Sequence, residues 1–146
     1  MKRYCWNFKL ILSSKENAIM VVHSHGDNMD KLYLASGFKY CLGTTEGKSF
    51  GNIHNFGGFT DGDRCVFLAK YFGAKKIILF GMDFGYKIGK YSKDKISNRT
   101  LKIRKLRRGK KLLEWFAIQN HSELYTTSKQ IKGFNKIRYA ELEKIL

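Results

Sequence analysis

Acidic side chains beside glycines are the residues of this sequence best suited to chemistry. Asp27 lies in the stretch HSHGDN, Asp61 and Asp63 lie in GGFTDGDR, and Asp83 lies in FGMDFG. Clustered carboxylates repel one another unless a cation joins them. Mg²⁺ is the natural candidate, because it commonly bridges one or two carboxylates to the phosphates of a nucleotide. These segments therefore predict Asp27, Asp61, Asp63 and Asp83 as metal ligands.

Glycines in the same segments favour phosphate binding. Without a Cβ atom, a glycine lets a phosphate come close to backbone N–H groups. A helix that starts near Asp61 would add the partial positive charge of its amino end. The glycines concerned are Gly26, Gly57, Gly58 and Gly81.

Each segment also has a plain structural interpretation. Asp61 fits an N-cap with Asp63 in the first helical turn, and Asp83 fits a turn. His23 and His25 share one face of a strand, where polar packing at the strand end is favoured over a metal role. It is the coincidence of the segments at strand and helix ends that favours a binding site.

Hydrophobic periodicity predicts the elements that must position these residues. Short apolar runs indicate strands, and apolar spacings of three and four indicate helices. The expected strands are 18–23, 39–42, 76–80 and 123–126, with a further short strand at Ile53 in the loop 43–56. The expected helices are 28–36, 61–72, 99–118 and 139–146, and a basic loop covers 86–96.

Alternating strands and helices predict an α/β fold, a three-layer Rossmann-like domain with a largely parallel sheet. A chain of 146 residues fits a single domain, 1–146. Ligands of such sheets bind beyond the carboxyl ends of the strands, and the three acidic segments are expected to gather at that edge. In the helix 99–118, Gly109 is expected to cost about 1 kcal/mol of helix stability.

Composition excludes several classes of protein. No stretch approaches the ~20 apolar residues of a membrane span, and no signal peptide is recognised. The three cysteines are widely spaced and form no CxxC pair, so neither a disulfide framework nor a zinc site is indicated. These features favour a cytoplasmic protein with no membrane partner.

The formal net charge is +16 and is concentrated in the second part of the chain, since residues 86–146 carry 17 Lys/Arg against 5 Asp/Glu. Such a block attracts anions, either the phosphates of a nucleotide or a nucleic-acid backbone. A nucleic-acid-binding protein is therefore the alternative function. It is less favoured, because acids lie at the strand ends and no known nucleic-acid-binding module is recognised.

Three stretches carry a resemblance to a known family. VVHSHGDN, NFGGFTDGDRCVFLAKYFGAKKIILFGMDFG and KLRRGKKLLEW resemble the archaeal 6-hydroxymethylpterin diphosphokinases, the MptE-like proteins. The resemblance implies a Rossmann-type fold and a Mg²⁺-dependent transfer of diphosphate from ATP to 6-hydroxymethyl-7,8-dihydropterin, with release of AMP, in tetrahydromethanopterin or folate-type pterin synthesis. The chain is expected to lack the N-terminal portion of the family.

The resemblance also implies which residues act. Catalytic roles are expected for His25, Asp61, Asp63 and Arg64, with His25 or a carboxylate accepting the proton of the substrate hydroxyl. Cations would neutralise charge that develops on the leaving AMP. The residues expected to bind ATP are Gly26, Asn28, Gly57, Gly58, Thr60, Gly81, Lys87, Lys90 and Arg104.

Further alternatives stay open at this point. The aspartate arrangement is also similar to that of thiamine diphosphokinases, which perform the equivalent transfer on another alcohol. A nucleotide-sugar transferase relative and a non-catalytic subunit are two other interpretations. ATP and a pterin are the expected small-molecule partners, and self-association of the chain is also expected.

Overall fold

The computed structural model describes residues 19–26, 28–85 and 98–146. The chain divides into two compact units, Met1–Phe56 and Gly57–Leu146, and each is described by itself. The expectation of one domain over 1–146 stays a prediction. The predicted basic loop 86–96 lies outside the described residues.

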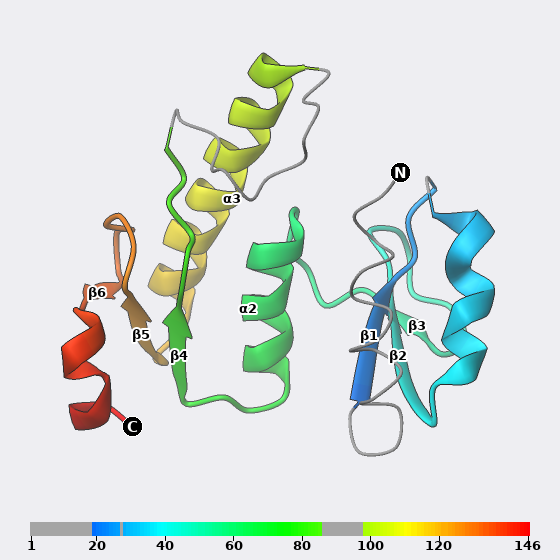
Figure 1. Ribbon diagram of the computed structural model, residues 1–146, viewed down its shortest axis with the longest axis horizontal. Helices are drawn as coiled ribbons and strands as arrows, with labels where there is room; N and C mark the ends of the chain where they lie inside the picture. The colour runs from blue at the N-terminus through cyan, green and yellow to red at the C-terminus, as the bar shows by residue number, and fades with distance from the viewer. Residues whose placement is uncertain (1–18, 27, 86–97) are drawn as a thin grey trace. The chain divides into compact units, whose positions relative to one another are not determined.

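The first unit is a small parallel sheet with one helix (Figure 1). Strand β1 (Ile19–His23) pairs in parallel with β2 (Tyr40–Thr44), and β2 pairs in parallel with the short β3 (Ile53–His54). Parallel neighbours need a crossover, which η1 (Met29–Gly37) provides between β1 and β2. The register places His23 beside Thr44, so both strands end together.

The second unit also has a three-stranded parallel sheet with crossover connections, but its helices are longer. Helix α2 (Asp61–Tyr71) leads to β4 (Lys76–Leu79), and α3 (Arg99–Gln119) is the crossover to β5 (Glu123–Thr126). β4 pairs in parallel with β5, and β5 with β6 (Asn135–Lys136). The 3₁₀ helix η2 (Tyr139–Lys144) follows β6, and Figure 1 shows it beside the β5–β6 end of this sheet.

The core of the second unit lies between its sheet and its two long helices. Val66 of α2 is 2% exposed, and Leu113 and Phe116 of α3 are 0% and 2% exposed. They cluster with apolar residues of β4, β5 and the 131–134 segment. Leu113 and Phe116 are three residues apart and therefore share one face of α3. Burial of this face and of Val66 fixes how the two helices pack on the strands.

The structure confirms the predicted α/β class. Within the described ranges, all four strand pairs are parallel, as expected for a Rossmann-like fold. Three elements differ from the prediction. The segments expected as helices at 28–36 and 139–146 are 3₁₀ helices, Met29–Gly37 and Tyr139–Lys144. Strand β6 was not predicted, because two polar residues carry no alternating pattern. Of the helices described, none combines the length and apolar character that crossing a bilayer requires.

Candidate functional site

In the first unit, the HSHGDN stretch forms a turn that one asparagine holds. Asn28 Nδ2 donates to the His23 carbonyl oxygen at 2.7 Å, and Asn28 Oδ1 accepts from the His25 N–H at 2.8 Å. His23 Nδ1 is 3.0 Å from Thr44 Oγ1, which ties the end of β1 to the end of β2. The predicted ATP contact Asn28 therefore has a structural function in this turn.

His25 and Gly26 lie at the exposed tip of this turn. The rings of His23 and His25 are 6.0 Å apart, but they do not share a strand face as predicted, because β1 ends at His23 and His25 lies beyond it. A Cβ atom at Gly26 would meet nothing within 4 Å, so this glycine is open to solvent within its unit. The predicted metal ligand Asp27 lies outside the described residues.

Replacing Asn28 with aspartate is expected to loosen the turn, because a carboxylate cannot donate to the His23 carbonyl oxygen. The loss is expected to be about 1 kcal/mol of local stability. Faster amide hydrogen exchange at His25 would report it, with Asn55→Asp in the β3 loop as the control. Unchanged exchange at His25 would contradict the structural role.

In the second unit, the GGFTDGDR stretch is a loop closed by a capping box. Thr60 is the N-cap of α2, and Asp63 is the third helical residue. Asp63 Oδ1 accepts from the N–H groups of Phe59 and Thr60, both at 2.7 Å, and the Thr60 hydroxyl donates to Oδ2 at 3.1 Å. The Asp63 side chain is fully buried. Its two oxygens thus provide hydrogen-bond acceptors for the N–H and hydroxyl groups of the loop that precedes the helix.

Arg64 is also occupied by this loop. It is 6% exposed, and its Nη1 donates to the Gly57 carbonyl oxygen at 3.1 Å. Gly58 has a φ of +88°, and a Cβ atom there would lie 2.5 Å from Arg64 Cα. The glycine pair lets the loop pass against the first turn of α2. Arg64 was predicted to be catalytic. In the structure it is buried, and its hydrogen bond to Gly57 holds the loop in place.

Three segments converge at the amino end of α2. A Cβ atom at Gly62 would lie 2.7 Å from Met82 Cε, on the segment that follows β4. A Cβ atom at Gly109 of α3 would lie 2.7 Å from Asp63 Oδ2 and 3.5 Å from Phe84 Cε1. Helix α2, the exit of β4 and the middle of α3 therefore form one junction. This is the edge where the sequence places Asp61, Asp63 and Asp83.

Asp61 and Asp83 are exposed at this junction. They neighbour Gly62 and Met82, and the tip of the Met82 side chain reaches Gly62. Burial raises the pKa of the Cys65 thiol, and the Asp61 carboxylate raises it further, because a nearby negative charge disfavours the thiolate. Among the residues that the structure describes, no three His, Cys, Asp or Glu side chains group as metal ligands. A Mg²⁺ site that phosphates complete needs only one or two carboxylates.

The predicted ATP-binding residues are spread over both units, with Gly26 and Asn28 in the first and the others in the second. Gly81 follows β4 with a φ of +68° and has open space at its Cα, and Arg104 is exposed on α3. Lys87 and Lys90 lie outside the described residues. Sequence reasoning missed Arg108, whose guanidinium carbon lies 5.6 Å from the centre of the Phe59 ring. The spacing of Arg104 and Arg108, one helical turn apart, could have pointed to it.

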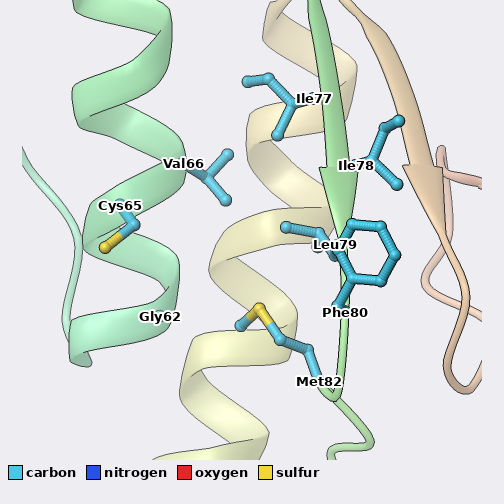
Figure 2. Close-up of a pocket in the computed structure, with 8 residues that line it drawn as sticks. All are labelled: Gly62, Cys65, Val66, Ile77, Ile78, Leu79, Phe80 and Met82. Atoms are coloured by element: carbon cyan, nitrogen blue, oxygen red, sulfur yellow. The ribbon is translucent and has the colours of Figure 1, made fainter. Parts of the chain in front are cut away.

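A shallow pocket of about 390 Å³ lies between α2 and β4. Figure 2 shows Val66 on α2 pointing toward β4, which carries Ile77 and Leu79, and Met82 on the chain beyond β4. Its lining residues carry no charged side chain. Binding sites combine apolar walls with a few polar groups that orient the ligand, so this pocket by itself does not select a substrate.

A family model confirms the resemblance. The model described as "6-hydroxymethylpterin diphosphokinase MptE-like" matches residues 3–89, which is more than half of the chain. The chain belongs to the MptE-like family. The match includes the three acidic segments and ends before α3.

Three relatives of this MptE-like chain are each named "6-hydroxymethyl-7,8-dihydropterin pyrophosphokinase". The protein from Pyrococcus furiosus is 48% identical over 109 residues, which cover 72% of this chain and 47% of the relative. That from Methanothermobacter thermautotrophicus is 41% identical, covering 73% and 48%. That from Methanocaldococcus jannaschii is 43% identical, covering 70% and 47%. The MptE-like chain thus spans about half the length of these curated relatives. No solved structure matches it.

Proposed function

We propose that this chain serves Mg²⁺-dependent diphosphate transfer from ATP to 6-hydroxymethyl-7,8-dihydropterin. The observation that carries the proposal is the family match over the three acidic segments, together with the shared name of relatives that are 41–48% identical. The junction in the second unit supports it, because α2, the exit of β4 and α3 meet where two acidic segments lie.

Asp61 and Asp83 fit a magnesium site best. Both side chains are exposed, and the tip of the Met82 side chain reaches Gly62, so the two acidic residues flank one contact between α2 and the segment after β4. Asp27, which belongs to the first unit and lies outside the described residues, stays a proposed ligand on the resemblance of its HSHGDN segment alone. Bound Mg²⁺ would neutralise charge on the phosphates and orient them.

Asp63 and Arg64 are proposed to position the site. The Asp63 carboxylate accepts three hydrogen bonds from the loop, and Arg64 holds the Gly57 carbonyl oxygen. Both groups keep the GGFTDGDR loop in one conformation. Transfer chemistry depends strongly on such positioning, since misplacement of the reacting groups slows it.

In the proposed step, the hydroxymethyl oxygen of the pterin attacks the β-phosphorus of ATP. An O–P bond forms, the bond from the β-phosphorus to the bridging oxygen of AMP breaks, and AMP leaves with that oxygen. The hydroxyl proton goes to His25, which is exposed at the tip of its turn, or to a carboxylate. A cation near the α-phosphate would stabilise the leaving group, and Arg104 is the proposed residue in the described part of α3.

Release of AMP tests the proposal directly. The full chain would be incubated with ATP, Mg²⁺ and reduced 6-hydroxymethylpterin, and AMP and the pterin diphosphate would be separated by chromatography. Equal amounts of both products are expected, with none when EDTA is added or the pterin is omitted. A folded chain that forms no AMP would show that this stretch of the family does not carry the activity alone.

Asp61→Asn and Asp83→Asn are each expected to lower the rate of AMP formation roughly 100-fold. Each change removes a negative charge that would hold the metal, and with it part of the electrostatic stabilisation of the transition state. Thermal stability is expected to stay nearly constant, since both side chains are exposed. Asp30→Asn, an exposed acid in the first turn of η1, is the matched control. Full activity in either variant would remove that residue from the site.

A cytoplasmic location and self-association are proposed as well. The exposed thiols of Cys41 and Cys65 are free, which suits a reducing compartment. Exposed apolar side chains such as Trp115 and Ile118 offer area for contact between copies. Light scattering at several protein concentrations would establish the oligomeric state.

A further inference from the structure

Helix α3 carries a dense set of cations. Acidic partners are few along it, because Glu114 is its only acid and lies 3.7 Å from Lys110. The helix itself supplies little negative charge, so its cations attract anions from elsewhere. The cations between the start of α3 and its middle are Arg99, Lys102, Arg104, Lys105, Arg107, Arg108, Lys110 and Lys111.

The contact at Gly109 fixes where these cations lie within the unit. Gly109 packs against Asp63 and Thr60 at the amino end of α2. The ten residues before it continue the helix for about 15 Å at 1.5 Å per residue. Figure 1 shows these first turns of α3 extending past the amino end of α2. Arg108 directly precedes Gly109 and thus borders this junction, and Arg104 lies one helical turn earlier in α3.

Arg108 is held in place more firmly than an ordinary surface arginine. Its guanidinium carbon lies 5.6 Å from the centre of the Phe59 ring, within the range of a cation–π interaction. Phe59 is fixed in turn, because its N–H donates to Asp63 Oδ1. A guanidinium over a ring face keeps its in-plane N–H donors for other partners. Arg108 therefore presents oriented donors beside the GGFTDGDR loop.

We propose that Arg108 binds the β- and γ-phosphates of the nucleoside triphosphate, with Phe59 as the residue that positions it. The inference rests on the proposed function. Arginine suits this role because its planar fork can bind two phosphate oxygens at once. Arg104, one helical turn earlier on the same side, adds a second positive charge. This assignment gives the basic helix a specific task, phosphate recognition at the junction.

Binding measurements on the full chain test the assignment separately from catalysis. Calorimetry would compare inorganic triphosphate, ATP and AMP on the unmodified chain, Arg108→Ala, Arg108→Lys and Phe59→Leu. Arg108→Ala is expected to weaken ATP and triphosphate binding roughly tenfold and to leave AMP binding unchanged. Arg108→Lys and Phe59→Leu are expected to give smaller losses for the same two ligands.

Arg107→Ala is the matched control, because it removes the same charge from the same helical turn but from a position about 100° around the helix. If Arg107→Ala and Arg108→Ala weakened triphosphate binding equally, the effect would come from the overall positive charge of the helix and not from Arg108 itself. That result would overturn the proposal. An unmodified chain that binds neither ATP nor triphosphate would overturn it too. Triphosphate binding that depends on Arg108 without any AMP formation would uphold the assignment while refuting the proposed activity.

Discussion

Gly109→Ala is expected to destabilise the second unit by about 2 kcal/mol, although alanine is the better helix former. A Cβ atom at this position would lie 2.7 Å from Asp63 Oδ2. The Asp63 side chain cannot turn away, because it is fully buried and accepts three hydrogen bonds. The helix must shift or the capping box must open, and overpacking of this kind typically costs about 1–3 kcal/mol.

Gly62→Ala is the matched control for this prediction. The new Cβ atom would also meet an atom at 2.7 Å, but that atom is Met82 Cε, the end of a flexible side chain. We expect its effect to stay within about 1 kcal/mol, since relief is easy and alanine favours the helix. Urea unfolding of both variants would measure the difference. Equal stability of the two variants would show that α3 does not press on the Asp63 carboxylate.

Asp63→Ala is expected to cost about 3 kcal/mol, because it removes the capping box and leaves the Phe59 and Thr60 N–H groups without their carboxylate acceptor. Asp63→Asn is expected to cost less than about 1 kcal/mol. Its amide oxygen can accept from both N–H groups, and its NH₂ group can donate to Thr60 Oγ1. Comparing the two variants distinguishes the effect of losing the hydrogen-bond acceptor, which only Asp63→Ala removes, from the effect of losing the negative charge, which both remove.

The same pair decides between a cap and a metal ligand. If Asp63 is a positioning residue, the asparagine variant keeps most of its activity and stability. If Asp63 binds Mg²⁺ directly, the asparagine variant folds normally yet loses activity. Thermal unfolding and AMP formation on the same samples would distinguish the two, with Asp30→Asn as the control for removal of a carboxylate.

Most of the elements could be predicted from local patterns. Strand β5 has the predicted bounds, Glu123–Thr126, and α3 ends one residue beyond the prediction, at Gln119. These segments have strong periodicity that tertiary contacts do not override. Strand β6 could not be predicted, because Asn135 and Lys136 form a strand only through their pairing with Tyr125 and Thr126.

The roles of the site residues were harder to predict. Asp61 was predicted as the N-cap, but this was wrong: Thr60 is the N-cap and Asp61 is the first helical residue. The spacing Thr-x-x-Asp before an apolar run, a capping-box pattern, could have indicated Thr60. Gly109 was predicted only as a weak point of its helix, whereas the structure uses it for close approach to Asp63. The Gly109 contact depends on which segments meet, and the spacing of residues along the chain does not contain that information.

The parallel pairing of β4 with β5 has a consequence during synthesis. Leu79 lies beside Thr126, so the strand that completes the pair leaves the ribosome long after β4. Until then, the backbone edge and the apolar side chains Ile77 and Leu79 have no sheet neighbour on that side, and such edges are prone to aggregate. Nascent chains halted before residue 123 should therefore depend on chaperones more than chains released after residue 136.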